Sequence, residues 1–321
     1  MLDKIDRGLL QKFEYGLNPQ SPEGSAIPAL IIGYGEMSTI FAINVPGQES
    51  LAYKRLPIFR TMDEMQSYEK LFQEYNSRLG EIGLNIPAFA VVRVAPRAGN
   101  MVIYNVQARL DARSIGNRLI HTLPKEGVMT LFGLTLAELN RVFTFNESGT
   151  GVKFGIDGQI SNWAAADYKE GFTIGPDTKL CYIDTSTPLM HIGGIEQLNP
   201  ELFLRSAPSF LLWIIRWLFL KDVMTRYYDF RKVVIDLIAN FYKEQLPELI
   251  PALINAANDF FANEGKKFNI APITGKEVLA YYREDAMIWR AYLALRKMDR
   301  FLHLRVLRKP YVYILPGKIK R

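Results

Sequence analysis

Short apolar runs alternate with turn residues over the first third of the chain. Each run is rich in β-branched and aromatic residues, and glycine, proline and asparagine separate them, a pattern typical of strands joined by tight turns. The runs are PALIIG (28–33), STIFAINV (38–45), LAYKRL (51–56), AFAVVRV (88–94) and NMVIYNVQ (100–107). This pattern predicts an antiparallel sheet.

The spacing of apolar residues changes between the third and fourth runs. In RTMDEMQSYEKLFQEYNSRLGEIG, apolar residues recur three or four positions apart, at Met65, Tyr68, Phe72, Tyr75 and Leu79. This is the period of a helix with one apolar face. One helix is therefore expected to pack on the sheet.

From about residue 126 the pattern is mostly helical. Helices are expected at 127–145, 206–228, 229–246, 248–263 and 275–302, with a short β-like region at 152–186. The predicted fold class is α+β, with an antiparallel-sheet part followed by a mainly helical part.

Composition indicates a globular protein. The chain has 321 residues, of which 49% are apolar and 22% are charged, enough to build a sizeable core. The single cysteine, Cys181, excludes an intrachain disulfide, and the histidines at 121, 191 and 303 lie far apart in sequence. We expect a cytoplasmic protein without a cysteine or histidine metal cage.

No membrane-spanning segment is expected either. The N-terminus lacks the basic-then-apolar pattern of a signal peptide. The most apolar run, FLLWIIRWLFL (210–220), is too short and contains Arg216.

Positive charge is concentrated at the C-terminus. The formal charge is +6, and residues 296–321 contain nine lysines and arginines against Asp299 alone. Apolar residues interleave with these charges, which favours a packed basic element. Binding of this segment to nucleic acid or to an acidic surface is the less favoured alternative.

The glycines of IIGYGEMSTIF lie between two predicted strands. Gly33 and Gly35 would let the backbone approach a ligand closely. A Rossmann loop is excluded, because no helix and no third glycine follow at the required spacing. A simple hairpin is the alternative, but Lys54 in the next strand needs an anionic partner if it points inward.

The predicted helix supplies acids that could hold this lysine. A lysine that binds two phosphates needs a carboxylate to fix its position. Glu74 is the first choice and Glu69 the second, although glutamates on such a helix commonly face solvent.

A second polar cluster lies near the middle of the chain. Asp157 and Asn162 are five positions apart in FGIDGQISNW, and Asp184 ends the apolar run KLCYID. A carboxylate at the end of a buried strand is costly without a cation or several donors. Converging carboxylate and amide oxygens are suitable ligands for Mg²⁺.

The order of these features resembles the protein-kinase-like superfamily. A glycine-bearing hairpin, a strand lysine, a helix acid, an Asp-x4-Asn loop and a strand-end Asp follow one another between residues 28 and 190. The loop DGQISN and the YID triplet look most like the aminoglycoside and choline phosphotransferase-like small-molecule kinases. The resemblance implies a bilobal fold, with an N-terminal extension (1–27), a sheet lobe (28–107), a helical lobe (108–295) and a basic segment (296–321).

The resemblance also implies two cofactors, ATP and Mg²⁺, and it assigns roles on the nucleotide side. Gly33, Gly35 and Ser38 would form the phosphate loop, and Lys54 would contact phosphates. The backbone from Tyr104 to Gln107 would meet the adenine edge.

On the catalytic side, Asp157 would act as the base, and Asn162 and Asp184 would bind Mg²⁺. The sequence departs from the family pattern at two places. Gly155 and Ile156 precede Asp157 where the family usually has His with Arg or Gly, and Thr185 and Ser186 follow Asp184 in place of Phe-Gly.

The expected function is ATP- and Mg²⁺-dependent transfer of the γ-phosphate to a hydroxyl of a small-molecule acceptor that the sequence does not identify. Because of the departures, the alternative is a nucleotide-binding pseudokinase that binds partners through its helical part. Nucleotidyl transfer by the same fold is a third reading.

Overall fold

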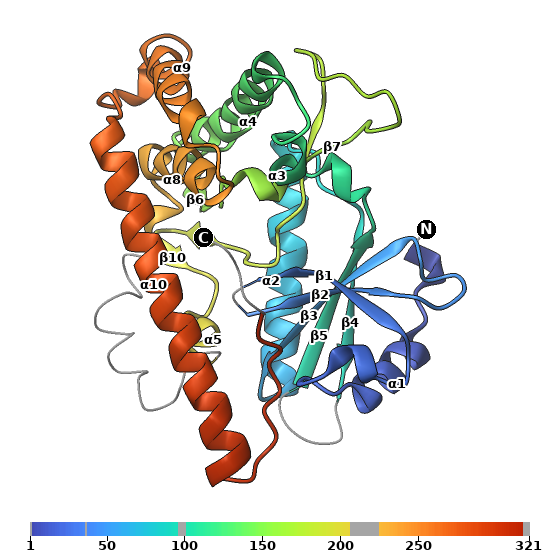
Figure 1. Cartoon of the computed structure of the whole chain (residues 1–321). Coiled ribbons are helices and arrows are strands. Elements are labelled where there is room, and N and C mark those ends of the chain that lie inside the picture. Colours follow the sequence, from blue (N-terminus) through green and yellow to red (C-terminus); the bar gives the residue numbers. More distant parts are fainter. Residues whose placement is uncertain (1, 36, 96–100, 206–224, 317–321) are drawn as a thin grey trace.

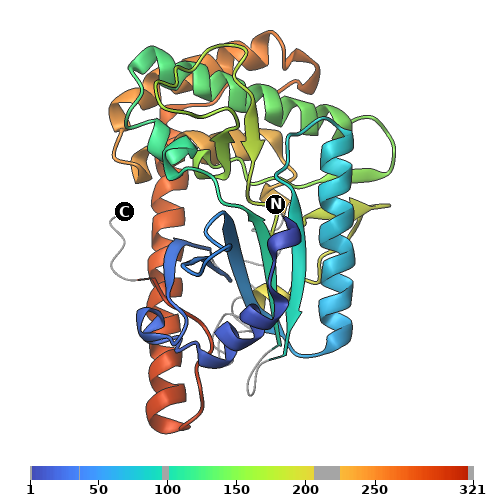
Figure 2. The ribbon, with the colours of Figure 1, turned by 90° about the vertical axis from the view of Figure 1, so that its right-hand side faces the viewer.

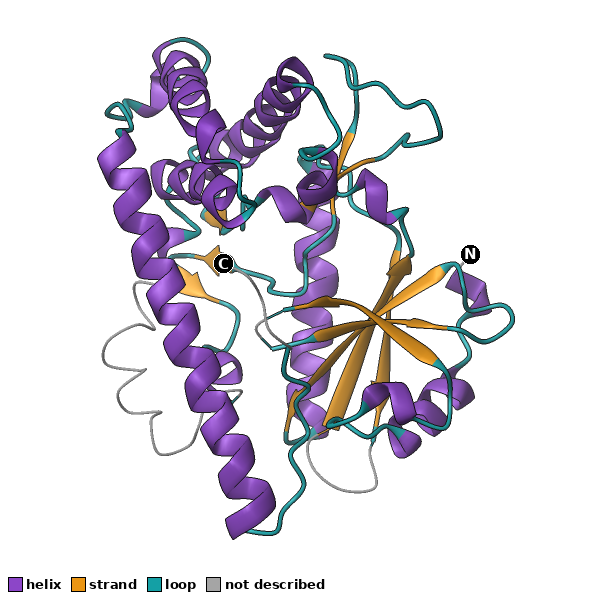
Figure 3. Ribbon diagram, viewed as in Figure 1, coloured by secondary structure: helices purple, strands orange, loops and turns teal. Residues whose placement is uncertain are grey.

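The computed structural model describes the chain except for residues 1, 36, 96–100, 206–224 and 317–321 (Figure 1). A sheet region (residues 2–108) precedes a helical region (residues 109–301), so the fold is α+β, as predicted (Figure 3). The five predicted strands are all present. They are β1 (Ala29–Tyr34), β2 (Thr39–Ile43), β3 (Leu51–Phe59), β4 (Phe89–Val94) and β5 (Met101–Ala108).

These strands form one antiparallel sheet in the order β1-β2-β3-β5-β4. One face packs on helix α1 (Arg7–Gly16) through Phe41, Tyr53 and Tyr104. Leu10 and Phe13 of α1 are buried there. The segment expected as an N-terminal extension therefore covers one side of the sheet.

The opposite face of the sheet packs on helix α2 (Met62–Glu81), which begins at the N-cap Thr61. The predicted apolar face of this helix is confirmed, since Met65, Tyr68, Phe72 and Tyr75 are all buried. Figure 1 shows α2 on the side of the sheet away from α1, and in the view of Figure 2 α2 and α10 lie to the right and left of the strands.

The helical region is built around one large apolar cluster. Its main helices are α4 (Lys125–Asn146), α8 (Phe230–Lys243), α9 (Ile250–Ala262) and α10 (Gly275–Phe301), with the short α3 (Gly116–Leu119) and α5 (Glu201–Leu204). Single 3-10 turns occupy Leu2–Lys4, Pro22–Gly24, Ala112–Ser114, Ile160–Asn162, Pro247–Leu249 and Lys266–Phe268. Most of the helix expected at 206–228 lies outside the described residues, because the structure does not describe residues 206–224.

The helical region also contains two small antiparallel sheets. One has the order β10-β9-β6, from β6 (Val152–Phe154), β9 (Met190–Ile192) and β10 (Ile195–Glu196). The other pairs β7 (Trp163–Ala165) with β8 (Leu180–Tyr182). Residues 166–179 form the long connection between β7 and β8.

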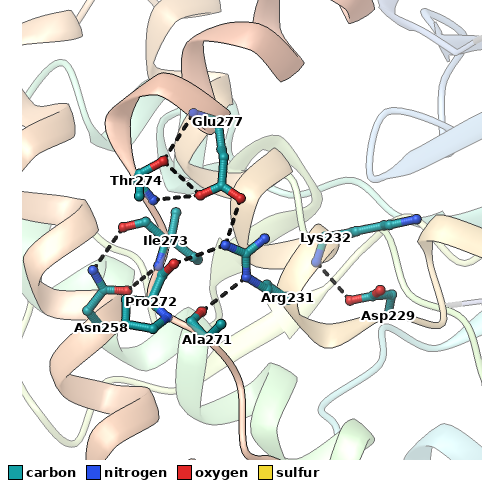
Figure 4. Close-up of polar contacts among 9 residues, drawn as sticks. All are labelled: Asp229, Arg231, Lys232, Asn258, Ala271, Pro272, Ile273, Thr274 and Glu277. Atoms are coloured by element: carbon teal, nitrogen blue, oxygen red, sulfur yellow. Dashed lines mark hydrogen bonds and ion pairs between the residues drawn. The ribbon is translucent and has the colours of Figure 1, made fainter.

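The start of α10 is fixed by a capping box and an arginine. Thr274 accepts from the Glu277 backbone N–H, and the Glu277 carboxylate accepts from Thr274 in return (Figure 4). Arg231 of α8 donates to the same carboxylate and to the carbonyls of Ala271 and Pro272. These bonds fix the N-terminal end of α10, which runs from the helical region to the bottom of the view in Figure 1.

The basic C-terminal segment packs on the sheet region. After α10 and a π-helical turn, η8 (Leu302–Val306), the chain returns along the sheet and buries Tyr311, Tyr313 and Ile314. The Val312 carbonyl accepts from Arg55. The expected packing is thus confirmed for residues 311–316, whereas residues 305–310 are exposed.

Among the described residues, one helix, α4, is long and apolar enough to cross a membrane by length and composition. Its apolar positions pack against α8 and α9 in the core, and buried core helices meet the same criterion. The apolar run 210–220, for which no span was expected, lies outside the described residues.

Candidate functional site

Most of the predicted polar residues converge on one cavity between the sheet region and the helical region. Its volume is about 200 Å³. Six residues chosen from the sequence line it: Gly35, Ser38, Lys54, Asp157, Asn162 and Asp184. Residues more than 100 positions apart in sequence therefore meet at a single site.

The turn between β1 and β2 lies directly over Lys54. The Gly35 backbone N–H donates to the Ser38 carbonyl (3.0 Å). A Cβ on Gly35 would lie 2.5 Å from the Ser38 hydroxyl and 3.9 Å from Cε of Lys54, so a larger residue here would displace the Ser38 side chain. Gly33 lies one step back, within β1 opposite Ile40, and does not line the cavity.

Lys54 pairs with Asp184 across the cavity. Its Nζ lies 2.6 Å from Oδ1 of Asp184, and the side chains are 14% and 36% exposed. The same carboxylate oxygen accepts from the Ser186 N–H (3.4 Å). The inward-facing lysine is therefore found with an anionic partner, as the sequence reasoning required.

The expected partner from helix α2 was wrong. Glu74 pairs with Arg78, and Glu69 pairs with Arg93. Each glutamate is adjacent in sequence to a residue of the buried face, Tyr75 and Tyr68 respectively. One helical position is a rotation of about 100°, which turns the carboxylate away from Lys54.

Tyr68 occupies the buried face of α2 near this ion pair. Its hydroxyl donates to the Ser186 carbonyl (2.8 Å) and accepts from Asn105 (2.9 Å). Burial, and more weakly the charge of Asp184, raises the pKa of this phenol. A neutral tyrosine thus links α2 to the Asp184 loop. The sequence contained a signal for this contact, because the predicted apolar face of the helix includes Tyr68 and no acidic residue.

The adenine contact expected at Tyr104 to Gln107 was also wrong. Both residues lie inside β5, and their backbones pair with β3 on one side and β4 on the other. The Tyr104 side chain points to the opposite sheet face, where its hydroxyl donates to Glu14. Gln107 stands opposite Ala52 and does not line the cavity.

Pairing of β7 with β8 brings Asn162 and Asp184 together. Trp163 faces Tyr182 in this ladder, and the Ile183 N–H donates to the Asn162 carbonyl (2.9 Å). The antiparallel register of β7 and β8 therefore places Asn162 next to Asp184, although they are 22 positions apart in sequence. The Asn162 amide also donates to the Asp157 carbonyl (3.2 Å), which ties the loop to itself.

The loop before Asp157 is supported by hydrogen bonds to its backbone. The Tyr75 hydroxyl donates to the Gly155 carbonyl, and the Ile156 N–H donates to the Tyr227 carbonyl. A Cβ on Gly155 would lie within 3.0 Å of Leu189 and Tyr228. Glycine is therefore required there by space.

Asp157 has a second carboxylate as a neighbour. Burial, and then the charge of Asp236 on α8, raises the pKa of Asp157 to about 7. Burial likewise raises the pKa of Asp236. Gln159 links the two residues, since its backbone N–H donates to Asp157 and its side-chain amide donates to Asp236. A carboxylate with a pKa near neutrality is suited to proton transfer.

The sequence reasoning also missed two cations at this end of the cavity. Lys243 donates to the Gln159 side chain (3.3 Å), and Arg226 lies over the Tyr227 ring. Both line the cavity with Asp157. Arg226 and Lys243 lie in predicted helices, and nothing in the local sequence indicated that they would lie near Asp157.

The donor set at Asn162 and Asp184 is small. In the described parts of the chain, no group of three or more histidine, cysteine or acidic residues could hold a metal ion. Two oxygen donors with the rest from water and phosphate are still a normal environment for Mg²⁺. One-third exposure of the Asp184 carboxylate fits such use.

A larger open groove, of about 870 Å³, lies between α2 and α4 and contains none of the predicted site residues.

Residues 21–300 of the chain match the family described as "Family of unknown function (DUF6206)", so the chain belongs to this family. The match spans the whole cavity. No protein of curated function matches the sequence.

Proposed function

We propose that this chain is an ATP- and Mg²⁺-dependent phosphotransferase with a kinase-like fold, acting on a hydroxyl of a small-molecule acceptor. The observation that carries the proposal is the convergence of Lys54, Asp157, Asn162 and Asp184 on one cavity beneath the β1–β2 turn. Phosphoryl transfer relies on positioning and charge stabilisation, which these groups provide.

The phosphates would lie beneath the turn that carries Gly35 and Ser38, next to Lys54. Asn162 and Asp184 would hold Mg²⁺, which supplies positive charge to the phosphate oxygens. Asp157 stands on the helical side of the cavity, where it would orient the acceptor hydroxyl and take its proton.

The cavity is smaller than the 300 to 1,000 Å³, roughly, of typical ligand pockets. The adenine would therefore lie outside it, on the sheet face that carries Lys54. The strand register places Leu30, Ile40 and Ala52 on this face, and Leu30 is 54% exposed. These apolar side chains would give a flat base a surface to pack against.

A specific observation favours the pseudokinase as the second candidate. Lys54 is held by Asp184 itself, at 2.6 Å, and α2 contributes neutral Tyr68 to this corner. If the Lys54–Asp184 ion pair persists when nucleotide binds, the two side chains would not be free to stabilise the transferred phosphate, and the site would bind nucleotide without transferring phosphate.

The first test is thermal unfolding of the full chain with and without Mg·ATP. Ligand that binds the folded state raises the melting temperature, and Lys54→Ala should remove most of this rise. Lys153→Ala, which changes an exposed strand lysine on β6, is the matched control. A folded protein with no shift at millimolar Mg·ATP would contradict both candidates.

The second test follows the label from ATP in the presence of a panel of hydroxyl compounds. Transfer from γ-labelled ATP supports the phosphotransferase, and transfer from α-labelled ATP indicates nucleotidyl transfer. Binding without any transfer supports the pseudokinase.

A further inference from the structure

The C-terminal end of α10 and the turn after it present exposed apolar side chains to solvent. Phe301, Val306 and Leu307 are 59%, 61% and 53% exposed. In sequence they lie at the end of α10 and in the turn that follows it, and Figure 1 shows the chain turning back toward the sheet there. Single exposed apolar residues are common, but three of them within residues 301–307 make this turn a candidate interaction surface.

The same turn is basic. Arg305, Arg308 and Lys309 are exposed, and none of them pairs with an acid anywhere in the described part of the chain. The only acid of residues 296–321, Asp299, is 7% exposed and lies beside His303. The turn therefore shows positive charge alone.

The turn is a built structure with distinct inner and outer sides. The Leu307 N–H donates to the Leu302 carbonyl, and the Lys309 N–H donates to the His303 carbonyl, both at 2.9 Å. Leu304 packs inward against the apolar cluster that includes Tyr311. The outward side chains are thus held outward by the backbone and by the packing beneath them.

We infer that this turn, residues 301–309, docks on the surface of an anionic lipid membrane. Interleaved exposed apolar and basic side chains fit the boundary between lipid headgroups and acyl chains. A nucleic-acid backbone would use the three cations but would gain nothing from Phe301, Val306 and Leu307. The inference does not depend on the proposed enzymatic function.

The test is co-sedimentation of the full chain with vesicles of equal parts phosphatidylserine and phosphatidylcholine, and with phosphatidylcholine alone. Binding is expected for the anionic vesicles and should weaken with added salt. One basic residue near an anionic surface raises affinity about fivefold. Replacing Arg305, Arg308 and Lys309 by glutamine should therefore weaken binding about 100-fold.

A second variant tests the apolar contribution. Replacing Phe301, Val306 and Leu307 by serine should weaken vesicle binding at least tenfold, roughly, since their apolar insertion is lost. The matched controls are Ile195→Ser, at a 70% exposed apolar site, and glutamine at the exposed Lys12, Lys125 and Lys169. The controls should bind vesicles as the unchanged chain does.

Three outcomes would overturn the inference. One is no binding to anionic vesicles at low salt by a chain that unfolds cooperatively. Another is binding that the serine variant retains in full. The third is tight RNA binding that competes with the vesicles and is lost only in the glutamine variant, which would assign the surface to nucleic acid.

Discussion

Two adjacent cations on β3, Lys54 and Arg55, point to opposite faces of the same sheet and meet different environments. Arg55 is 3% exposed, binds both oxygens of Glu14 and donates to the Val312 carbonyl. Lys54 has one carboxylate partner and lines a cavity. A cation whose donors are all satisfied inside the protein stabilises the fold. A cation with one partner and access to a cavity retains donors for a ligand.

The same contrast applies to the carboxylates. Glu14 is closed in by Arg55 and by the Tyr104 hydroxyl, and it lies where α1 meets the sheet. Asp157 is half-buried at the cavity, and burial and then the carboxylate of Asp236 raise its pKa. Glu14 is therefore neutralised inside the fold, whereas the raised pKa of Asp157 at a cavity is suited to proton transfer.

The largest expected effect sharpens the catalytic side of this contrast. If Asp157 is the base of the proposed reaction, Asp157→Asn lowers turnover by a factor of about 10²–10⁴. Affinity for Mg·ATP should stay nearly unchanged, because the nucleotide contacts remain. Turnover with a labelled acceptor and thermal shift with Mg·ATP measure the two quantities. Unchanged turnover in an active preparation would mean that the base is another group.

The next effect is on stability and separates the two neighbouring cations directly. Arg55→Met leaves the Glu14 carboxylate buried without its cation and should cost about 3–5 kcal/mol in the free energy of unfolding. Lys54→Met should change this free energy by about 1 kcal/mol or less, since Asp184 is partly exposed. Chemical denaturation measures both values.

The double variant Arg55→Met with Glu14→Gln is the control for this pair. Removing both charges should recover much of the loss, because no unpaired charge is left. Equal losses for Lys54→Met and Arg55→Met would remove the distinction between the two faces.

A smaller effect is expected at Asn162 and Asp184, the proposed Mg²⁺ ligands. Asp184→Asn should weaken Mg·ATP binding and turnover together, by about tenfold or more, and Asn162→Ala should do so to a smaller degree. Titration calorimetry and turnover rates give the two numbers. If Asp184→Asn lowers turnover while Mg·ATP affinity stays the same, Asp184 is not a ligand of the bound metal.

The smallest effect concerns the pH dependence of stability. The pKa of Asp157 is raised from 3.8 to about 7 in the folded chain, so the folded state holds a proton that the unfolded chain releases. Stability contributed by this site therefore falls as the pH rises from about 4 to about 7 and stays low above that interval.

Asp157→Asn should consequently be more stable than the unchanged chain at about pH 8, by at least about 1 kcal/mol. The advantage should disappear toward about pH 4, and melting curves across this interval measure it. The control Asp177→Asn, at an exposed position, should show no such trend. A constant difference at every pH would contradict the raised pKa.

Local pattern was enough to predict most elements of this fold. The five strands, the apolar face of α2 and the helices α4, α8, α9 and α10 follow from apolar spacing and turn residues, because burial of one face imposes that spacing. The sequence also indicated Lys54, Asp157, Asn162 and Asp184, since polar residues at strand ends and inside apolar strands need partners.

The tertiary structure alone decided which partners these residues have. Whether Lys54 meets Glu74, Glu69 or Asp184 depends on the rotation of α2 against the sheet and on the β7–β8 register. Asp236 joins Asp157 across 79 positions of sequence, and Arg55 meets Val312 across 257. Apolar spacing records which side of an element is buried, but not which buried side faces which, so these contacts follow from packing and not from local sequence.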